Sequence, residues 1–411
     1  MEISVYSVVF SVLVVLLIIT INNNKAFAEP IFKDTNLRAE LVVQGLNSPT
    51  SMAFLDENHI LVLEKNSGNV LLVSNGVLQK QPVLKLHVDH TTLTCCRGLL
   101  GIAIASDKSG QSQNVFLYYS ELLDGKDSVR NRLYRYAWNG ESLVNPVLIL
   151  DLPATPGPNH PAGKIAIGLD GYLYTLIGDL NNEGKLQNVK DGPDPNDSSA
   201  IFKVNATDGS PSKGNPFTDT KMGKYYGYGV RNSFGLAVDP LTGVLWDTEN
   251  GDKDFDEINL AKPGFNSGWR QLMGPLSENK ISVNNLVRFS GSHYSDPVFS
   301  FAPSLGVTDI QFFNSTKLGN KYANNVFVGD INHGNLYFFM LNKTRTGFVF
   351  GQNERNLMDS VANGEKELSE VTLGAGFAGI TDIKTGPDGY LYILTFDEES
   401  HGAGKIYRIS H

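Results

Sequence analysis

The sequence predicts an all-β protein whose strands form a closed ring of β-blades. Forty-one glycines and eighteen prolines among 411 residues are typical of a chain with many turns. Its apolar segments are short, are bounded by Gly, Asp or Pro, and lack the length of a helix. After residue 28, no helical period extends over eleven or more residues, which disfavours a parallel sheet with crossover helices.

One pattern occurs six times along the chain. It consists of a strand, a D-G or T-G turn, a second strand with aromatic residues, a polar loop and a third strand. The clearest copies are GKIAIGLDGYLYTLIGD at 163–179, GLAVDPLTGVLWDTENG at 235–251 and TDIKTGPDGYLYILTFD at 381–397. Six copies predict a six-bladed β-propeller with four-stranded antiparallel blades. In such a ring, the polar loops of successive copies meet at one end of the central channel.

The first copy and the last segment of the chain indicate how the ring closes. The first copy has apolar strands at 39–43, 60–64 and 69–73. The C-terminal segment GKIYRIS, at 404–410, is expected to pair near the N-terminal strand, because a closed ring leaves no sheet edge exposed. The predicted propeller therefore spans residues 37–411.

The first 28 residues predict that the protein leaves the cytoplasm. Residues 3–21 form an uninterrupted apolar run, and a polar patch then leads to the small-residue pattern Ala26-Phe27-Ala28. This order is typical of a signal peptide cleaved after Ala28, which would comprise residues 1–28. The apolar run also approaches the length of a membrane span, so an uncleaved anchor through residues 3–21 is the alternative. Both interpretations are extracytoplasmic: secreted, periplasmic or attached to the cell surface.

The charge of the chain limits its partners. Acidic residues outnumber basic ones by 43 to 34, which gives a net charge of −9. A nucleic-acid-binding protein needs a basic face, so we expect no nucleic acid partner.

The densest group of polar residues lies between residues 226 and 269. It contains Arg231, in YGYGVRNSFG, and the acidic loop ENGDKDFDE at 249–257. Carboxylate and carbonyl oxygens suit Ca²⁺ better than Zn²⁺, so the loop is a candidate calcium site. Its spacing differs from that of an EF-hand loop, and an acidic surface turn without metal is the alternative.

Three further polar residues suggest acid–base chemistry. His160 lies in the loop ATPGPNHPAGK before a strand, and Asp179 ends the next strand of the same copy. If both face the channel, Asp179 can accept the imidazole N–H and leave His160 as a general base. Arg231 could stabilise an oxyanion or bind a carboxylate. The alternatives are a surface histidine and an arginine paired with a nearby carboxylate.

The two cysteines of the chain, Cys95 and Cys96, are adjacent. They lack the further ligands that a zinc site needs. In an oxidising compartment they could form a strained vicinal disulfide, whose flat ring could be a stacking surface for a planar cofactor. Two buried thiols that pack as small apolar groups are the alternative.

From Leu37 to Ile409 the sequence resembles the soluble quinoprotein glucose and aldose sugar dehydrogenases, the glucose/sorbosone dehydrogenase family. The resemblance lies in GLNSPTSMAFLDENHILVLEKNSGNV, GLLGIAIA, the His160 loop, GYGVRNSFGLAVDPLTGVLWDTENG, DEINLAKPGFNSGW and GPDGYLYILT. It implies a six-bladed β-propeller. The ectodomain of Hedgehog-interacting proteins, which are binding modules, shares this fold, so the fold alone does not decide the activity.

The resemblance also implies pyrroloquinoline quinone (PQQ) and calcium at the mouth of the channel. His160, oriented by Asp179, would be the general base on the anomeric hydroxyl of a sugar, while a hydride passes to PQQ. Arg231 and Asn232 would contact the quinone.

Two calcium sites are implied in the same way. Main-chain oxygens of Gly251 and Asp252 would hold the ion that polarises the cofactor. The Glu257 carboxylate and the Ser267 carbonyl would hold a structural ion.

The chain departs from the family pattern where the cofactor is bound. Phe234 replaces a glutamine, Asn332 replaces a lysine, and Gly379 and Thr381 replace paired arginines. Asn332, Thr381 and the cysteine pair would then contact the cofactor. Each lost cationic contact removes a charge-assisted hydrogen bond worth roughly 1.5–3 kcal/mol. The cations that could compensate are Arg97, Lys164 and Lys203.

These observations predict an enzyme that oxidises an aldose or related polyol with PQQ and Ca²⁺ and passes electrons to an unidentified acceptor. The alternative is a catalytically silent propeller that binds a glycan or a protein, which the lost cations favour. A calcium-dependent lactone hydrolase is a third option, disfavoured by the His160 loop.

Overall fold

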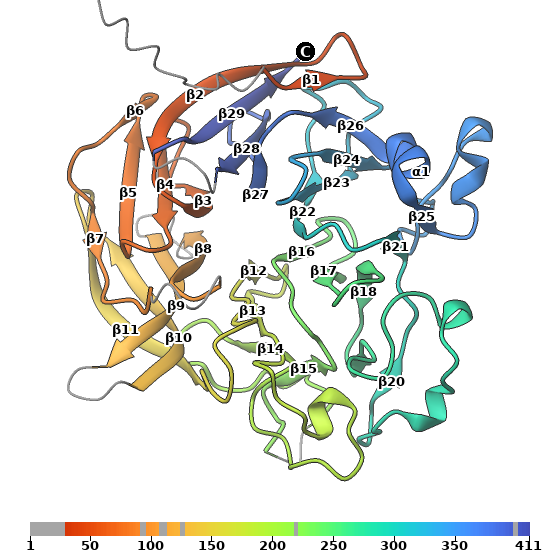
Figure 1. Cartoon of the computed structure of the whole chain (residues 1–411). Helices are drawn as coiled ribbons and strands as arrows, with labels where there is room; N and C mark the ends of the chain where they lie inside the picture. The colour runs from red at the N-terminus through yellow and green to blue at the C-terminus, as the bar shows by residue number, and fades with distance from the viewer. Residues whose placement is uncertain (1–28, 91–95, 107–112, 124–127, 218–220, 398–401) are drawn as a thin grey trace, which may run out of the picture.

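A computed structural model describes residues 29–90, 96–106, 113–123, 128–217, 221–397 and 402–411 (Figure 1). The strands of these residues form six sheets arranged in a ring around a central channel. The prediction of a six-bladed propeller is therefore confirmed. The predicted signal segment, residues 1–28, lies outside the described residues.

Each blade has a core of four antiparallel strands, which are named below in order from the channel outward. Blade 1 contains β3 (Pro49–Phe54), β4 (His59–Glu64), β5 (Asn69–Ser74) and β6 (Val77–Leu78), and β7 (Leu84–Lys85) also pairs with β5. Blade 2 contains β8 (Leu99–Ser106), β9 (Gln113–Leu123), β10 (Ser128–Trp138) and β11 (Leu143–Leu152). Blade 3 contains β12 (Ile165–Ile167), β13 (Tyr172–Ile177), β14 (Ala200–Asn205) and β15 (Tyr225–Tyr228).

The second half of the ring repeats this order. Blade 4 contains β16 (Gly235–Val238), β17 (Leu245–Asn250), β18 (Asp256–Ala261) and β21 (Phe299–Ala302). Blade 5 contains β22 (Val307–Phe313), β23 (Asn325–Asp330), β24 (Leu336–Phe339) and β26 (Thr372–Ala375). Blade 6 contains β27 (Gly379–Thr385), β28 (Leu391–Phe396), β29 (Gly404–Ser410) and β2 (Arg38–Leu46).

Short elements extend the outer edges of three blades. The added strands are β19 (Phe265–Asn266) and β20 (His293–Tyr294) on blade 3, β25 (Val361–Asn363) on blade 4 and β1 (Ile31–Phe32) on blade 5. The described helices are α1 (Gly364–Val371) and the 3₁₀ turns η1 (Lys185–Gln187), η2 (Leu276–Glu278), η3 (Val283–Asn285) and η4 (Gln352–Leu357). None of the described helices is long and apolar enough to cross a membrane.

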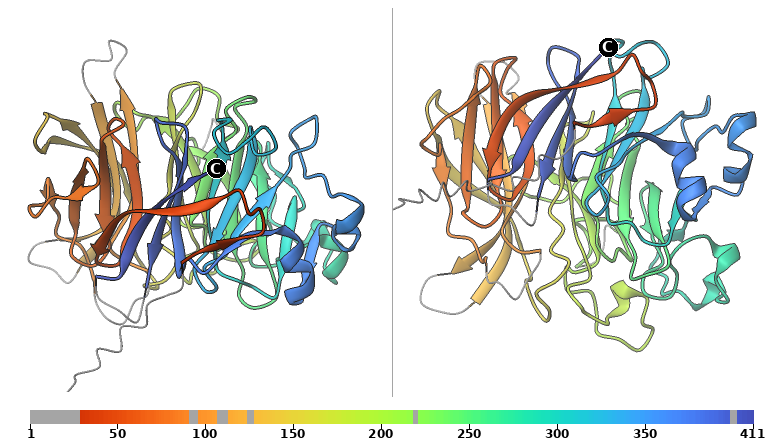
Figure 2. Two further views of the ribbon diagram at one scale, coloured as in Figure 1. Left: turned by 90° about the horizontal axis from the view of Figure 1, so that it is seen from above. Right: turned by 45° about the horizontal axis from the view of Figure 1, so that its top comes forward.

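The ring closes where the two ends of the chain meet in blade 6. β2 pairs antiparallel with β29, so that Leu41 lies opposite Tyr407; Figure 2 shows the two strands side by side. The predicted pairing of GKIYRIS with the N-terminal strand is confirmed. The expected strand at 39–43 therefore belongs to blade 6, because blade 1 takes its inner strand from β3 instead.

Apolar side chains fill the spaces between neighbouring blades. Trp246 of blade 4 is fully buried and packs edge-on against Phe312 of blade 5, with ring centroids 6.0 Å apart. Because every blade packs on two others, strands near the channel such as β4 and β13 are buried on both faces, whereas the outer strands β2 and β11 keep exposed residues. This packing holds the polar loops at the ends of the strands in place.

Four charged side chains cross-link the inner strands inside the channel, and we call them the channel cluster: Lys164, Asp309, Asp382 and Lys384. The Nζ atom of Lys164 lies 2.9 Å from Asp309 and 2.6 Å from Asp382. Burial raises the pKa of Asp309 to about 6. Burial also opposes ionisation of Asp382, yet Lys164 and Lys384 hold the pKa of that carboxyl below its usual range. The cluster ties together blades 3, 5 and 6.

Candidate active site

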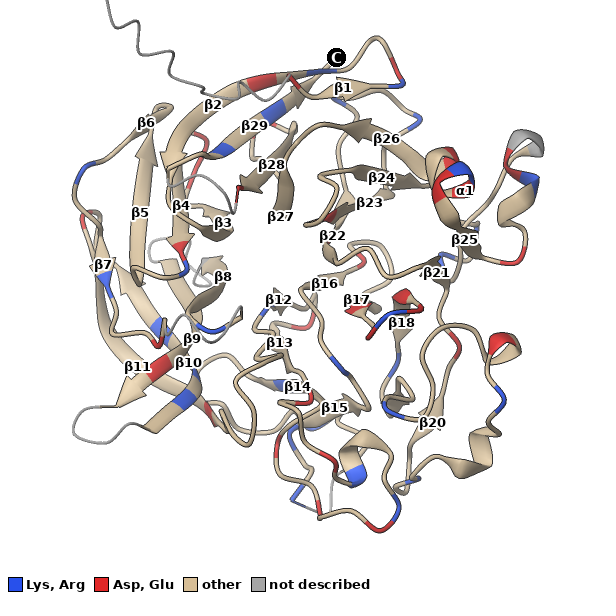
Figure 3. Cartoon of the chain, in the orientation of Figure 1, with Lys and Arg blue, Asp and Glu red and all other residues tan. Residues whose placement is uncertain are grey.

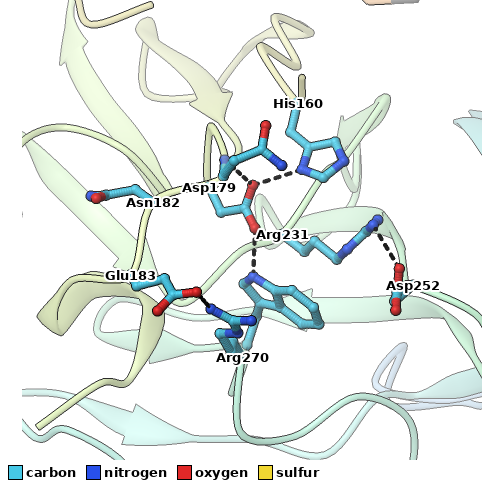
Figure 4. A pocket seen from close by; sticks show the side chains of 9 residues that line it. His160, Asp179, Asn182, Glu183, Arg231, Asp252 and Arg270 are labelled. Carbon is cyan, nitrogen blue, oxygen red and sulfur yellow. Dashed lines mark hydrogen bonds and ion pairs between the residues drawn. The ribbon is translucent and has the colours of Figure 1, made fainter. Parts of the chain in front are cut away.

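A pocket of about 270 Å³ opens beside the start of β12 and the end of β13. It lies between loops of blades 3 and 4, as Figure 4 shows. Its lining residues are His160, Asp179, Asn181, Asn182, Glu183, Arg231, Asp252, Trp269 and Arg270. Antiparallel pairing explains the gathering, because a loop before an inner strand and a loop after the next strand lie at the same end of a blade.

The central feature of the pocket is a hydrogen-bonded row of His160, Asp179 and Trp269. The Nδ1 atom of His160 lies 2.6 Å from the Asp179 carboxylate. The other carboxylate oxygen accepts the indole N–H of Trp269 at 2.8 Å. A carboxylate can only accept, so Nδ1 carries the proton, and in the neutral imidazole Nε2 keeps its lone pair. The row therefore leaves His160 as a proton acceptor.

Backbone contacts at Gly178 hold the loops of this row together. The Gly178 N–H donates to the carbonyl of His160 at 3.1 Å, and the Asp179 N–H donates to the carbonyl of Arg231 at 2.8 Å. A Cβ atom on Gly178 would lie 2.3 Å from the Arg231 carbonyl oxygen and 2.6 Å from that of His160. Only glycine allows this approach of three segments.

The His160 loop is also fixed from blade 2. Arg97 forms an ion pair with Asp89 at 2.8 Å and donates to the carbonyl of Ala154. The hydroxyl of Tyr118 donates to the carbonyl of Pro161 at 3.0 Å. These bonds hold both ends of the loop, so His160 keeps its orientation without a helix or strand around it.

Arg231 crosses the floor of the pocket. Its Nη1 donates to the carbonyl of Asn250 at 3.0 Å, and its Nη2 lies 3.5 Å from Asp252. The guanidinium lies over the Trp269 ring, 5.2 Å from its centroid. Among the described residues, the buried Nε of Arg231 and the buried Oδ1 of Asn232 have no hydrogen-bond partner. Such atoms are rare in folded proteins, because a buried polar atom normally has a partner such as a water, an ion or a ligand.

Buried carboxylates lie together behind the pocket, on the face of blade 4 that Figure 3 shows to be acidic at β17 and β18. Glu249 lies opposite Glu257 across these strands, and Asp247 lies two residues from Glu249 on the same face. Burial raises the pKa of Glu249 to about 7 and that of Glu257 well above its usual range. Three neighbouring buried carboxyls cannot all ionise unless a cation lies beside them.

The predicted structural calcium ligands belong to this buried group. The hydroxyl of Ser267 donates to Glu249 at 2.5 Å, and Glu257 accepts the Gly274 N–H at 2.6 Å. Asp247 has two buried carboxylate oxygens without a partner among the described residues. No described group of three or more His, Cys, Asp or Glu side chains has the geometry of a metal site. A calcium ion would therefore need main-chain oxygens as well, as the sequence implied.

The acidic loop itself has a structural use. The Asp256 carboxylate accepts the N–H groups of Leu305, Gly306 and Val307 at 2.7–3.1 Å and that of Gly251 at 2.9 Å. It therefore fixes the start of blade 5 beside the pocket. Asp252 remains at the rim, with 67% of its side chain exposed.

The sequence from residue 46 to residue 408 matches the model of the glucose/sorbosone dehydrogenase family. The chain belongs to this family. It is 26% identical over 381 residues to the aldose sugar dehydrogenase YliI of Escherichia coli K12, covering 91% of this chain and 93% of that protein. It is 28% identical over 276 residues to quinoprotein glucose dehydrogenase B of Acinetobacter calcoaceticus, covering 62% of this chain and 56% of that protein.

Solved structures of the family share the fold. The PQQ-bound aldose sugar dehydrogenase of Streptomyces coelicolor superimposes with a TM-score of 0.65 at 24% identity, over 91% of this chain and 97% of that one. This likeness concerns the fold alone. The binding of PQQ is a property of that protein.

The structure brings together part of the predicted site. His160, Asp179, Arg231 and Asp252 line one pocket, and Asn232 is buried next to Arg231. Asn332 and Thr381 do not line it; the hydroxyl of Thr381 instead lies 3.4 Å from the carbonyl of Leu394.

The cysteine prediction is only partly covered by the described residues. Cys96 is disulfide-bonded. Cys95 lies outside the described residues, so the predicted stacking surface stays a prediction.

Sequence reasoning missed four lining residues and the partner of the His–Asp pair. Trp269 ends the polar-rich stretch at 226–269, but its indole contact with Asp179 joins residues 90 positions apart. The overlooked lining residues are Asn181, Asn182, Glu183 and Arg270. A signal was present for the first three, which lie two to four positions after Asp179 in the loop after β13.

The pocket fits the quinone group of PQQ better than it fits the rest of that molecule. The Nε of Arg231, which has no partner among the described residues, can donate to a quinone oxygen. Asp252 and nearby main-chain oxygens offer the hard donors that calcium prefers.

Proposed function

We propose that this family member oxidises an aldose sugar or a related polyol, with His160 as the general base. The observation that carries the proposal is the row of His160, Asp179 and Trp269 at the pocket. Asp179 holds the imidazole by Nδ1, so Nε2 is ready to accept the proton of a substrate hydroxyl. Asp179 then stabilises the imidazolium that forms.

The overall reaction converts the CH–OH group of the substrate to a carbonyl. The hydroxyl proton goes to Nε2 of His160, and the hydride leaves from the same carbon. A quinone such as PQQ, when bound beside Arg231 and Asn232, supplies the hydride acceptor. Arg231 places a positive charge where negative charge develops, and low solvent exposure strengthens that interaction.

A dye-linked oxidation assay with added PQQ and Ca²⁺ tests the proposal on a broad aldose panel. Removing a general base costs roughly 10²- to 10⁴-fold in rate, so His160→Asn is expected to lower kcat by that factor. The matched control is His59→Asn, which breaks a similar His–Asp pair (2.8 Å) on blade 1, away from the pocket. No oxidation of any aldose, together with no quinone binding by titration, would refute the proposal.

The alternative, a silent propeller that binds a glycan or a protein, is favoured by one observation. Both arginines that line the pocket already face carboxylates, Arg231 with Asp252 and Arg270 with Glu183. A glycan array with wild type and His160→Asn distinguishes the two functions. Equal glycan binding by both, without any oxidation, would favour the silent propeller.

We further propose that the propeller is extracytoplasmic, on the basis of the apolar run at 3–21 and the small residues before Glu29. N-terminal sequencing of the mature protein tests this. A chain that begins at Glu29 supports cleavage, and retention of residue 1 in a membrane fraction supports the anchor. A cytosolic chain that retains residue 1 would refute both.

A further inference from the structure

The described side chains that line the pocket carry no surplus positive charge for a ligand before a calcium ion is bound. Its lining contains three carboxylates, Asp179, Glu183 and Asp252, and two guanidinium groups. Arg231 lies 3.5 Å from Asp252, and Arg270 forms an ion pair with Glu183. The third carboxylate, Asp179, accepts hydrogen bonds from the other side chains of its row. PQQ has three carboxylates of its own, which need cations or strong donors in a pocket.

Three cations that could have compensated are bound elsewhere. Arg97 pairs with Asp89 at 2.8 Å beneath the His160 loop. Lys203 pairs with Asp170 at 2.7 Å, and only 12% of the lysine side chain is exposed. Lys164 is buried in the channel cluster. Moving any of them into the pocket would take a cation away from a carboxylate.

The positions in blades 5 and 6 that the family pattern assigns to cofactor contacts do not supply a cation either. A Cβ atom on Gly379 would lie 2.7 Å from the carbonyl oxygen of Ile331, so the backbone leaves no room there for a longer side chain. Thr381 and Asn332 carry neutral side chains, and neither lines the pocket.

The same pocket suits a planar group of low charge. The Trp269 indole lines it and is held in place through Asp179. Arg231 keeps one buried N–H without a partner among the described residues, and Asn232 keeps one buried oxygen. The Arg231 N–H can donate to an oxygen of a quinone, whereas Asn232 lies buried beside Arg231, outside the described lining of the pocket.

We propose that the pocket binds a planar ortho-quinone that carries fewer ionised carboxylates than PQQ. The inference rests on the proposed function, because it names the class of the cofactor for the same site. It follows from the pairing of both lining arginines and from the commitment of Arg97, Lys164 and Lys203 to other carboxylates.

The test compares PQQ with its trimethyl ester, which keeps the quinone and masks the three carboxylates. Both are titrated into the full-length purified protein at one fixed Ca²⁺ concentration, and binding is followed by quenching of tryptophan fluorescence. The ester is expected to bind at least as tightly as PQQ. Glu183→Gln releases Arg270 and is expected to tighten PQQ binding on the order of five- to tenfold without changing the Kd of the ester. The control is Glu57→Gln, an exposed carboxylate of the β3–β4 turn, which should change neither Kd.

The outcomes separate this inference from the proposed function. PQQ binding that is tenfold or more tighter than ester binding overturns the inference and leaves the proposed function standing. Equal tightening of both ligands by Glu183→Gln also overturns it, because the effect would not be one of charge. Binding of neither ligand, with a folded protein by circular dichroism, overturns both.

Discussion

Replacing Lys164 by methionine would remove one of the two cations that neutralise Asp309 and Asp382 in the channel. The lysine side chain is 5% exposed, and the two aspartates are almost fully buried. Methionine keeps most of the volume of lysine, so the change isolates the charge. Asp309 and Asp382 would then face each other with Lys384 as the remaining partner inside the cluster.

The expected loss is about 3–5 kcal/mol in the free energy of unfolding, the cost of breaking a buried ion pair on one side. Urea denaturation at pH 7, followed by tryptophan fluorescence, measures it. The matched control is Lys185→Met, whose partner Asp194 has a side chain that is 78% exposed, so that the free energy of unfolding should stay close to that of wild type. Adding Asp309→Asn to Lys164→Met restores the charge balance and should recover part of the loss. If the free energy of unfolding of Lys164→Met lies within about 1 kcal/mol of the wild-type value, the channel cluster does not hold the ring together, because breaking a buried ion pair should cost several times that.

Three other predictions concern the site, the closure and the metal. Gly178→Ala should abolish sugar oxidation while far-ultraviolet circular dichroism stays unchanged, because its Cβ would push the Arg231 carbonyl away from Asp179. Normal activity of the variant would show that the backbone contacts at Gly178 are not needed for the reaction. Hydrogen bonds from Ser410 and Arg408 lower the pKa of Glu40 to about 2, so its contribution is present above its ordinary pKa of 4.5 and is lost as the pH falls toward 2. Glu40→Gln should therefore lower the free energy of unfolding by about 1 kcal/mol at pH 7, a value discounted for the exposure of the side chain. In denaturation curves, the difference between the variant and wild type should shrink below pH 4. A difference that does not depend on pH would refute this. Calcium at 100 times its Kd should stabilise the protein by about 2.7 kcal/mol, and this rise in Tm should disappear in Glu257→Gln.

Most of the fold could be predicted from the repeats, because each copy contains its own strands and turns. Alternating apolar residues and Gly-containing turns are local signals, and the antiparallel pairing within a blade follows from them. The exception is the strand at 39–43, which pairs with β29 at the other end of the chain. The residues of this strand do not indicate which strand it pairs with, although closure of the ring requires that it have a partner.

The site was predictable only where a residue type and its place in a blade both pointed to chemistry. His160, Asp179 and Arg231 met that condition, and they line one pocket. Contacts between distant loops gave no such signal. The Trp269 indole meets Asp179 across 90 positions, and Lys164 meets Asp382 across 218. Pairings of this kind depend on the three-dimensional ring, in which blades far apart in sequence become neighbours.

The closure by β2 and β29 sets an order on biosynthesis. β2 is among the first segments of the propeller to be made, and β29 is the last, yet they are neighbours in blade 6. During synthesis β2 has no partner strand until β29 emerges, so the unfinished propeller keeps an open sheet edge at blade 6. If the chain is exported, crossing the membrane before blade 6 closes would spare it from unfolding a finished ring.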